Sequence, residues 1–174
     1  MIELHRGDIL KIEADAIVLP AHTSLLSGSG LSGIIHFASG KKLEEVCLTY
    51  GAQSIGSVVL TSSYKLKNCK FIINACGPRW YSNTKDDKEE LLRLVYRNIF
   101  QCCLDNGINL VLLPAISTGG YQFPLDTATH VAVSEAMRYQ DDKRLSIIFV
   151  NNEFEKHHIY QKTLTQMGIH YVIG

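Results

Sequence analysis

The sequence predicts a single α/β domain, folded as a three-layer α/β/α sandwich around a mixed, mostly parallel central sheet. Three observations support this prediction. The chain has 174 residues, which is enough for one domain with a substantial core. Short apolar runs alternate with amphipathic helical patterns along the whole length. Several of the runs are continuously apolar, as expected for strands that helices cover on both faces.

Seven strands are expected, in short runs rich in β-branched and aliphatic residues. They are Ile2 to His5, Ala16 to Leu19, Ser57 to Thr61, Phe71 to Ala75, Leu110 to Leu113, Leu145 to Val150 and His170 to Ile173. The short connections between the first strands predict that part of the sheet is antiparallel. No repeat or flexible linker interrupts the pattern, so residues 1–174 are expected to form one domain.

Five helices are expected between these strands. The clearest has apolar residues at three- and four-residue spacing, acids in its first turn and Gly107 after its end. Another opens at Pro124, a residue favoured at the first helical position. The expected helices are Leu31 to Ser39, Lys41 to Thr49, Asp86 to Asn106, the helix opening at Pro124, and Glu153 to Met167.

Composition and charge exclude several classes of function. The 17 basic residues balance the 17 acidic ones, which argues against broad electrostatic capture of nucleic acid or of an anionic membrane. The first residues lack the pattern of a secretory signal, and no apolar run is long enough to span a bilayer. We therefore expect a cytoplasmic monomer with no membrane association and no independent nucleic-acid site.

The five cysteines predict a reduced protein without a structural metal. Their number is odd and no CxxC pair occurs. No metal and no cofactor are implied by this pattern. Cys76 has no His or acid near it in the sequence, so we expect a small buried residue there rather than a nucleophile.

Two glycine-bearing loops carry the functional prediction. Ser27 to Gly33 follows the second strand, Ser117 to Tyr121 follows the fifth, and each leads toward a helix. Their small side chains leave backbone N–H groups unobstructed, so two such loops side by side could grip a diphosphate without any lysine. The alternatives are a flexible surface turn for the first loop and a plain strand–helix connection for the second.

Asp8 is a further candidate, in the turn Gly7-Asp8-Ile9 after the first strand. An Asp in a turn ordinarily accepts a hydrogen bond from its own backbone. The functional alternative is that it accepts one from an amino group, such as that of adenine.

Five segments, in order, resemble the macrodomain family, whose fold binds ADP-ribose. They are Gly7-Asp8-Ile9; Asp15 to Val18 with Ser24 to Leu26 and the first glycine loop; Ile35-His36; Gly77-Pro78-Arg79-Trp80; and Pro114 to Gly119 with Pro124 beyond. The resemblance covers nearly the full length and implies that ADP-ribose or an ADP-ribosylated macromolecule is the partner.

The resemblance also implies a role for each segment. Asp8 would hold the adenine amino group, and the Ile9 amide would contact the ring. The distal ribose and one phosphate would be wrapped by Gly28, Ser29, Gly30, Leu31 and Ser32. The second glycine loop would cover the diphosphate from the other side, with Ser117, Thr118, Gly119, Gly120 and Tyr121. Family members often stack an aromatic residue on adenine where this chain has Asn151-Asn152, so Asn152 or Phe154 is expected beside the base.

Two departures from the family pattern concern catalysis. Hydrolases of the family often read NAAN where this chain reads Leu19-Pro20-Ala21-His22, so Ala21 and His22 are expected at the distal ribose. Some hydrolases carry an acid where this chain has Ser32. An imidazole could hydrogen-bond a ribose hydroxyl or help to deprotonate water. His22 and Ser32 are therefore the catalytic candidates. The alternative for His22 is a partly buried histidine whose hydrogen bonds are made to the backbone.

Three functions remain open at this point. The first is an ADP-ribosyl hydrolase that removes mono-ADP-ribose from macromolecules or deacetylates O-acetyl-ADP-ribose. The second is a non-catalytic reader of ADP-ribose, because His22 and Ser32 stand at the usual Asn and acid positions. The third is a phosphatase that acts on phosphate esters of ADP-ribose.

Overall fold

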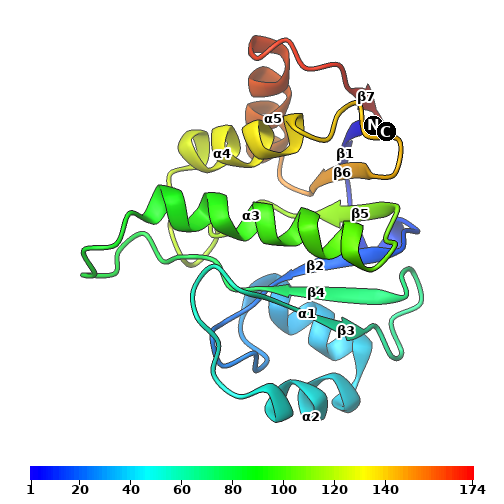
Figure 1. Ribbon diagram of the computed structural model, residues 1–174, viewed down its shortest axis with the longest axis vertical. Coiled ribbons are helices and arrows are strands. Elements are labelled where there is room, and N and C mark those ends of the chain that lie inside the picture. Colours follow the sequence, from blue (N-terminus) through cyan, green and yellow to red (C-terminus); the bar gives the residue numbers. More distant parts are fainter.

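The computed structural model describes residues 1–174 and confirms the α/β sandwich (Figure 1). One sheet holds seven strands in the order β3-β4-β2-β5-β6-β1-β7. They are β1 (Ile2–Arg6), β2 (Ala16–Pro20), β3 (Val58–Ser62), β4 (Phe71–Ala75), β5 (Leu110–Leu113), β6 (Ser146–Asn151) and β7 (Val172–Ile173). All seven match expected strands.

One pair of strands is antiparallel and the rest are parallel. The antiparallel pair is β3 and β4, joined through residues 63–70. The strands β1 and β2, which have a short connection, are not neighbours, because β1 pairs in parallel with β6 and β7. A 3-10 turn, η1 (Ile9–Lys11), follows β1, and β5 and β6 lie between β1 and β2. The mixed sheet was therefore predicted correctly, but the short first connection does not form a hairpin.

All five expected helices are present, and they form two layers. They are α1 (Gly30–Ser39), α2 (Lys41–Tyr50), α3 (Lys88–Asp105), α4 (Leu125–Met137) and α5 (Phe154–Gln166). In Figure 1, α3, α4 and α5 follow one another over one face of the sheet, and α1 and α2 lie over the other. None of these helices has the length and hydropathy needed to cross a bilayer.

The two helical layers explain why the central strands are continuously apolar. In β2, Ala16 and Val18 are buried in the core under α3, α4 and α5, whereas Ile17 and Leu19 are buried in the core under α1 and α2. Successive side chains of a strand point to opposite faces, so a strand between two helical layers needs an apolar residue at every position.

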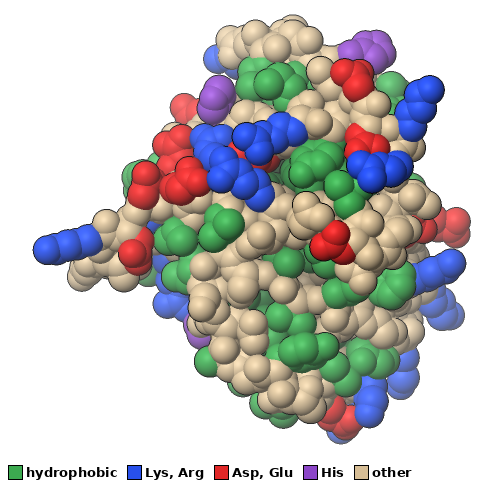
Figure 2. All heavy atoms as spheres, in the orientation of Figure 1, with side chains coloured by type: hydrophobic (Ala, Val, Ile, Leu, Met, Phe, Trp, Pro, Cys, Tyr) green, Lys and Arg blue, Asp and Glu red, His purple; other side chains and the backbone are tan.

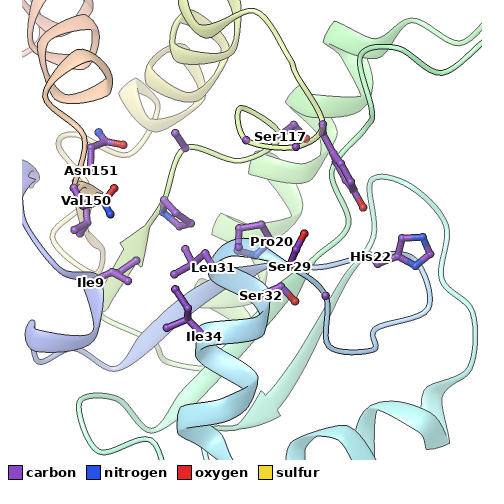
Figure 3. A pocket seen from close by; sticks show the side chains of 18 of the residues that line it. Ile9, Pro20, His22, Ser29, Leu31, Ser32, Ile34, Ser117, Val150 and Asn151 are labelled. Carbon is purple, nitrogen blue, oxygen red and sulfur yellow. The ribbon is translucent and has the colours of Figure 1, made fainter.

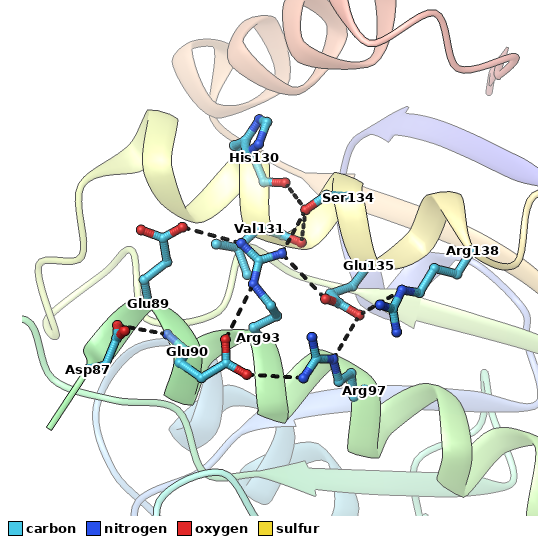
Figure 4. Close-up of polar contacts among 10 residues, drawn as sticks. All are labelled: Asp87, Glu89, Glu90, Arg93, Arg97, His130, Val131, Ser134, Glu135 and Arg138. Atoms are coloured by element: carbon cyan, nitrogen blue, oxygen red, sulfur yellow. Dashed lines mark hydrogen bonds and ion pairs between the residues drawn. The ribbon is translucent and has the colours of Figure 1, made fainter.

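A polar network joins α3 to α4 beside the apolar core (Figure 4). Its centre is the Glu135 carboxylate of α4, whose side chain is only 2% exposed. Arg93 and Arg97 of α3 approach this carboxylate to 3.4 and 3.3 Å, and Arg138 approaches it to 3.7 Å. Figure 2 shows basic and acidic side chains mixed on the surface over α3 and α4. Because the basic and acidic side chains on this face pair with one another, the face carries no large excess of either charge.

The parallel strands bring the candidate segments to one edge of the sheet. The carboxyl ends of β1, β2, β4, β5 and β6 lie at the same edge, because β1, β6, β5, β2 and β4 are parallel neighbours. Along this edge the order is β4, β2, β5, β6, β1. Residues that follow different strands in the sequence are therefore neighbours in space, as is usual for ligand sites of α/β sheets.

Candidate functional site

An elongated cavity of about 1010 Å³ lies at this edge of the sheet (Figure 3). Most of the residues predicted for the ligand site line it. They are Asp8, Ile9, His22, Gly28, Ser29, Gly30, Leu31, Ser32, Ser117, Gly119, Gly120, Tyr121 and Asn152. Two predicted residues do not reach it. Ala21 is buried in the core below, and the Thr118 hydroxyl donates to the Ala115 carbonyl at 2.8 Å.

The first glycine loop presents free backbone N–H groups at the start of α1. None of the N–H groups from Gly28 to Ser32 finds a hydrogen-bond acceptor, and the N-cap residue Ser29 makes no side-chain cap. The first turn also contains no acid. The positive end of the α1 dipole therefore remains unsatisfied where the helix meets the cavity, which is the usual geometry for binding an anion.

Gly33 holds this loop close to the helix. A Cβ atom on Gly33 would overlap the carbonyl oxygen of Gly28. Because that oxygen belongs to the backbone, it has no rotamer by which to move away. A glycine is therefore needed at position 33 for the loop to keep its present course.

The second glycine loop offers a matching set of free N–H groups. Those of Ser117, Gly119, Gly120 and Tyr121 have no acceptor. The loop is closed by two backbone bonds of 2.9 Å, from Gln122 N–H to Gly119 O and from Phe123 N–H to Ser117 O. Ser117 has a φ of +64°, which is unusual for a residue other than glycine and marks a constrained turn.

Two buried hydroxyl groups also have no partner. The Oγ atoms of Ser32 and Ser117 come from the two glycine loops, and both residues line the cavity. Their exposed fractions are 8% and 6%. A buried hydroxyl without a partner costs about 1–3 kcal/mol, so the arrangement is explained best by a polar ligand that supplies the missing bonds.

The β6 and β1 end of the cavity combines apolar walls with a few polar groups. Ile9 and Val150 contribute the apolar surface, and Figure 3 shows them beside Asn151. Asp8 accepts a hydrogen bond from the Leu10 N–H at 3.0 Å through one carboxylate oxygen, so the expected turn bond is present. Its other oxygen, the Ile9 N–H and the Asn151 side-chain nitrogen have no partner in the protein. Such a mixture suits a flat heterocycle with donors and acceptors on its edge.

Several residues at the β6 and β1 end of the cavity were not predicted from the sequence to contact a ligand. Asn151 lines it directly, together with Glu153 and Lys156 of the α5 region, whose side chains form an ion pair at 3.0 Å. Phe154, named as a substitute for the aromatic partner, does not line the cavity. Its ring stacks on His158, with 5.9 Å between the ring centroids, and is 64% exposed.

His22 lies near the opposite, β2 and β4 end of the cavity, as Figure 3 shows. Its Nδ1 accepts a hydrogen bond from the Ser24 N–H at 3.1 Å and lies 2.9 Å from the Ser24 hydroxyl. An acceptor role for Nδ1 puts the proton of the neutral ring on Nε2. His22 therefore presents a donor, and not a basic nitrogen, at its outer edge.

Arg79 is the cation of this end of the cavity. It belongs to the segment after β4, which the sequence singled out without giving the arginine a role. The two carboxylates that line the cavity, Asp8 and Glu153, both belong to the other end, after β1 and β6.

Buried Cys76 lies below His22, with its sulfur 3.7 Å from the His22 carbonyl oxygen. Burial raises the pKa of this thiol, which favours the small buried residue expected there over a nucleophile.

The fold and the cavity define an α/β ligand-binding domain whose site lies across the carboxyl ends of parallel strands. The chain belongs to the macro domain family, since the model of that family matches residues 18–132.

Comparisons with individual proteins agree with this assignment. A macro domain-containing protein of Mesorhizobium japonicum is 39% identical over 150 residues, which cover 85% of this chain and 84% of the relative. An O-acetyl-ADP-ribose deacetylase of Enterobacter cloacae is 36% identical over 173 residues, which cover 96% and 95%. The structure of a mutant Oceanobacillus iheyensis macrodomain with ADPR superposes with a TM-score of 0.89 at 32% identity, over 95% of this chain and 92% of the other.

Proposed function

We propose that this chain binds ADP-ribose in the cavity, with the diphosphate between the two glycine loops. The observation that carries the proposal is the set of free N–H groups on both loops, together with the unpartnered Ser32 and Ser117 hydroxyls. In this pose adenine lies at the Asp8 and Asn151 end, and the distal ribose lies at the His22 end. The ADPR in the structure of the Oceanobacillus relative supports the same choice of ligand.

Calorimetry with ADP-ribose tests this proposal directly. We expect one-to-one binding, with affinity falling in the order ADP-ribose, ADP, AMP, because each shorter ligand gives up contacts with the glycine loops or the distal end. Neutral amide donors provide most of the phosphate contacts, so the affinity should depend only weakly on salt. If ADP-ribose gives no heat and does not compete with ADP, the assignment is wrong.

We propose further that the chain is a hydrolase acting at or near the distal ribose. It would release mono-ADP-ribose from a modified macromolecule or deacetylate O-acetyl-ADP-ribose. Several relatives are named for the second activity, as O-acetyl-ADP-ribose deacetylases. Water would attack the anomeric carbon of the distal ribose or the acetyl carbon, and the bond from that carbon to the carrier or to the ribose oxygen would break. Because Asp8 and Glu153 belong to the other end of the cavity, the ligand's own diphosphate would take the proton of the water and pass it to the leaving oxygen. The loop amides would stabilise the developing negative charge, and the His22 Nε2–H would orient a ribose hydroxyl or the water.

The alternative is a reader that binds ADP-ribose without turning it over. Two observations favour it: the distal end offers no carboxylate base, and the Nδ1 atom of His22 is already engaged by Ser24. The two functions share the same binding pose and differ only in whether bound water is activated.

Substitution of His22 separates the hydrolase from the reader. We expect His22→Ala to lower the rate of release from a mono-ADP-ribosylated protein about tenfold, the loss of one positioning hydrogen bond. ADP-ribose affinity should change less than threefold, and His22→Asn should keep most of the activity because its amide still donates. His130→Ala, on exposed α4 surface, is the control. Unchanged turnover in His22→Ala would remove the role of this residue, and an inactive parent protein would favour the reader.

A further inference from the structure

Arg79 lines the end of the cavity at which the proposed pose places the distal ribose. The ends of β2 and β4 are adjacent, since Ala21 N–H donates to Ala75 O at 2.8 Å. The chain after β4 therefore runs beside His22, and Arg79 lines the cavity there. Figure 1 shows the segment between β4 and α3 projecting beyond the edge of the sheet.

The backbone around Arg79 is fixed by three hydrogen bonds. Trp80 N–H donates to Tyr121 O at 2.9 Å, which ties the segment to the second glycine loop. The ammonium of Lys88 donates to the carbonyl oxygens of Trp80 and Ser82, both at 2.6 Å. Lys88 is thus occupied by backbone carbonyls and offers little to a ligand.

The guanidinium of Arg79 is held in place but has no anionic partner. Its Cζ atom lies 5.0 Å from the centroid of the Tyr121 ring, a cation–π contact that orients the group. No carboxylate forms an ion pair with it, whereas Lys156, the other cation of the cavity, is paired with Glu153. A half-buried, oriented guanidinium with its N–H groups free is suited to bind a carboxylate or phosphate through two bonds.

We propose that Arg79 recognises an acidic side chain of the carrier protein next to the attachment site of ADP-ribose. This inference rests on the proposed binding of ADP-ribose. The glycine loops already supply donors for the diphosphate, which leaves Arg79 for a second anion beyond the distal ribose. A protein carrier fits better than a nucleic acid, because a phosphate backbone calls for several free cations, and the other cation that lines the cavity, Lys156, is already paired with Glu153.

Binding of paired peptides tests this specificity. The probes are free ADP-ribose and two peptides that carry ADP-ribose through an uncleavable link, one with glutamates and one with glutamines beside the attachment site. We expect the parent protein to bind the glutamate peptide about five- to tenfold more tightly, with a preference that fades at high salt. Arg79→Gln should remove the preference and leave the affinity for free ADP-ribose within about twofold.

Two further variants complete the experiment. Arg79→Lys keeps the charge but loses the planar fork, so an intermediate preference is expected. Lys85→Gln removes one exposed charge from the same segment outside the cavity and should leave the preference intact. Binding of free ADP-ribose without any preference for glutamate would overturn the inference and leave the proposed function standing. If Arg79→Gln loses the same affinity for all three probes, Arg79 binds the ligand's own diphosphate and the inference is wrong. If the parent protein binds none of the probes, the proposed function itself is wrong.

Discussion

Replacing Gly33 with alanine is expected to lower the affinity for ADP-ribose about a hundredfold. The added Cβ would overlap the Gly28 carbonyl oxygen, so the first glycine loop must move away from the start of α1. This movement removes the free N–H groups of the loop from their place beside the diphosphate. Loss of charge-assisted hydrogen bonds worth about 3 kcal/mol in total corresponds to this change in affinity.

The matched control is Gly28→Ala in the same loop. A Cβ atom on Gly28 would have only the Ser32 Oγ within reach, at 3.9 Å, and Gly28 has no positive φ. The free Gly28→Ala protein should therefore have the same loop structure and melting temperature as the parent. Titration calorimetry with ADP-ribose and a crystal structure of Gly33→Ala check the prediction. Affinity of Gly33→Ala within threefold of the parent would show that the N–H groups of this loop do not hold the ligand.

Replacing Glu135 with alanine is expected to destabilise the fold by about 3 kcal/mol. The change would leave three guanidinium groups at the contact between α3 and α4 without their shared carboxylate (Figure 4). Removing one member of a buried ion pair costs about 3–5 kcal/mol, and the partial exposure of the arginines favours the lower value. For a domain of this size the melting temperature should fall by about 6–12 °C.

The exposed pair of Lys42 and Glu45 on α2 is the control for Glu135. Its contact of 3.6 Å is similar in length to the contacts of Glu135, but both side chains are 63% exposed. Glu45→Ala should leave the melting temperature unchanged, because water and salt screen exposed charges. Both variants should keep the parent affinity for ADP-ribose, since neither residue lines the cavity. Equal shifts in melting temperature for the two variants would mean that burial adds nothing to the α3–α4 network.

The secondary structure could be predicted well because burial imposes a clear pattern on this chain. A strand between two helical layers is apolar at every position, as in Ala16 to Leu19, and each amphipathic helix has an apolar stripe at its own spacing. Strand pairing was harder to predict. The short connections between the first strands predicted antiparallel pairing, which is present between β3 and β4, whereas β1 and β2 have two strands between them.

The candidate site was predictable where it depends on local chemistry. Small residues after a strand and before a helix gave the two glycine loops, and the turn at Asp8 gave a third segment. Asn151, Lys156 and the role of Arg79 did not follow in this way, because nothing local distinguishes them from other polar residues. The place of Phe154 was not predictable for a related reason: it lies at the start of α5, where its ring stacks on His158 and does not line the cavity.

The sequence by itself determined the strands, the helices and the two loops of small residues, because each depends on contacts or conformations within a few residues. The tertiary structure alone decided that the two glycine loops face one cavity, and that Arg79 and Asp8 stand at opposite ends of it. These properties depend on which strands are neighbours, and strand order is fixed by the packing of residues that lie far apart in the chain.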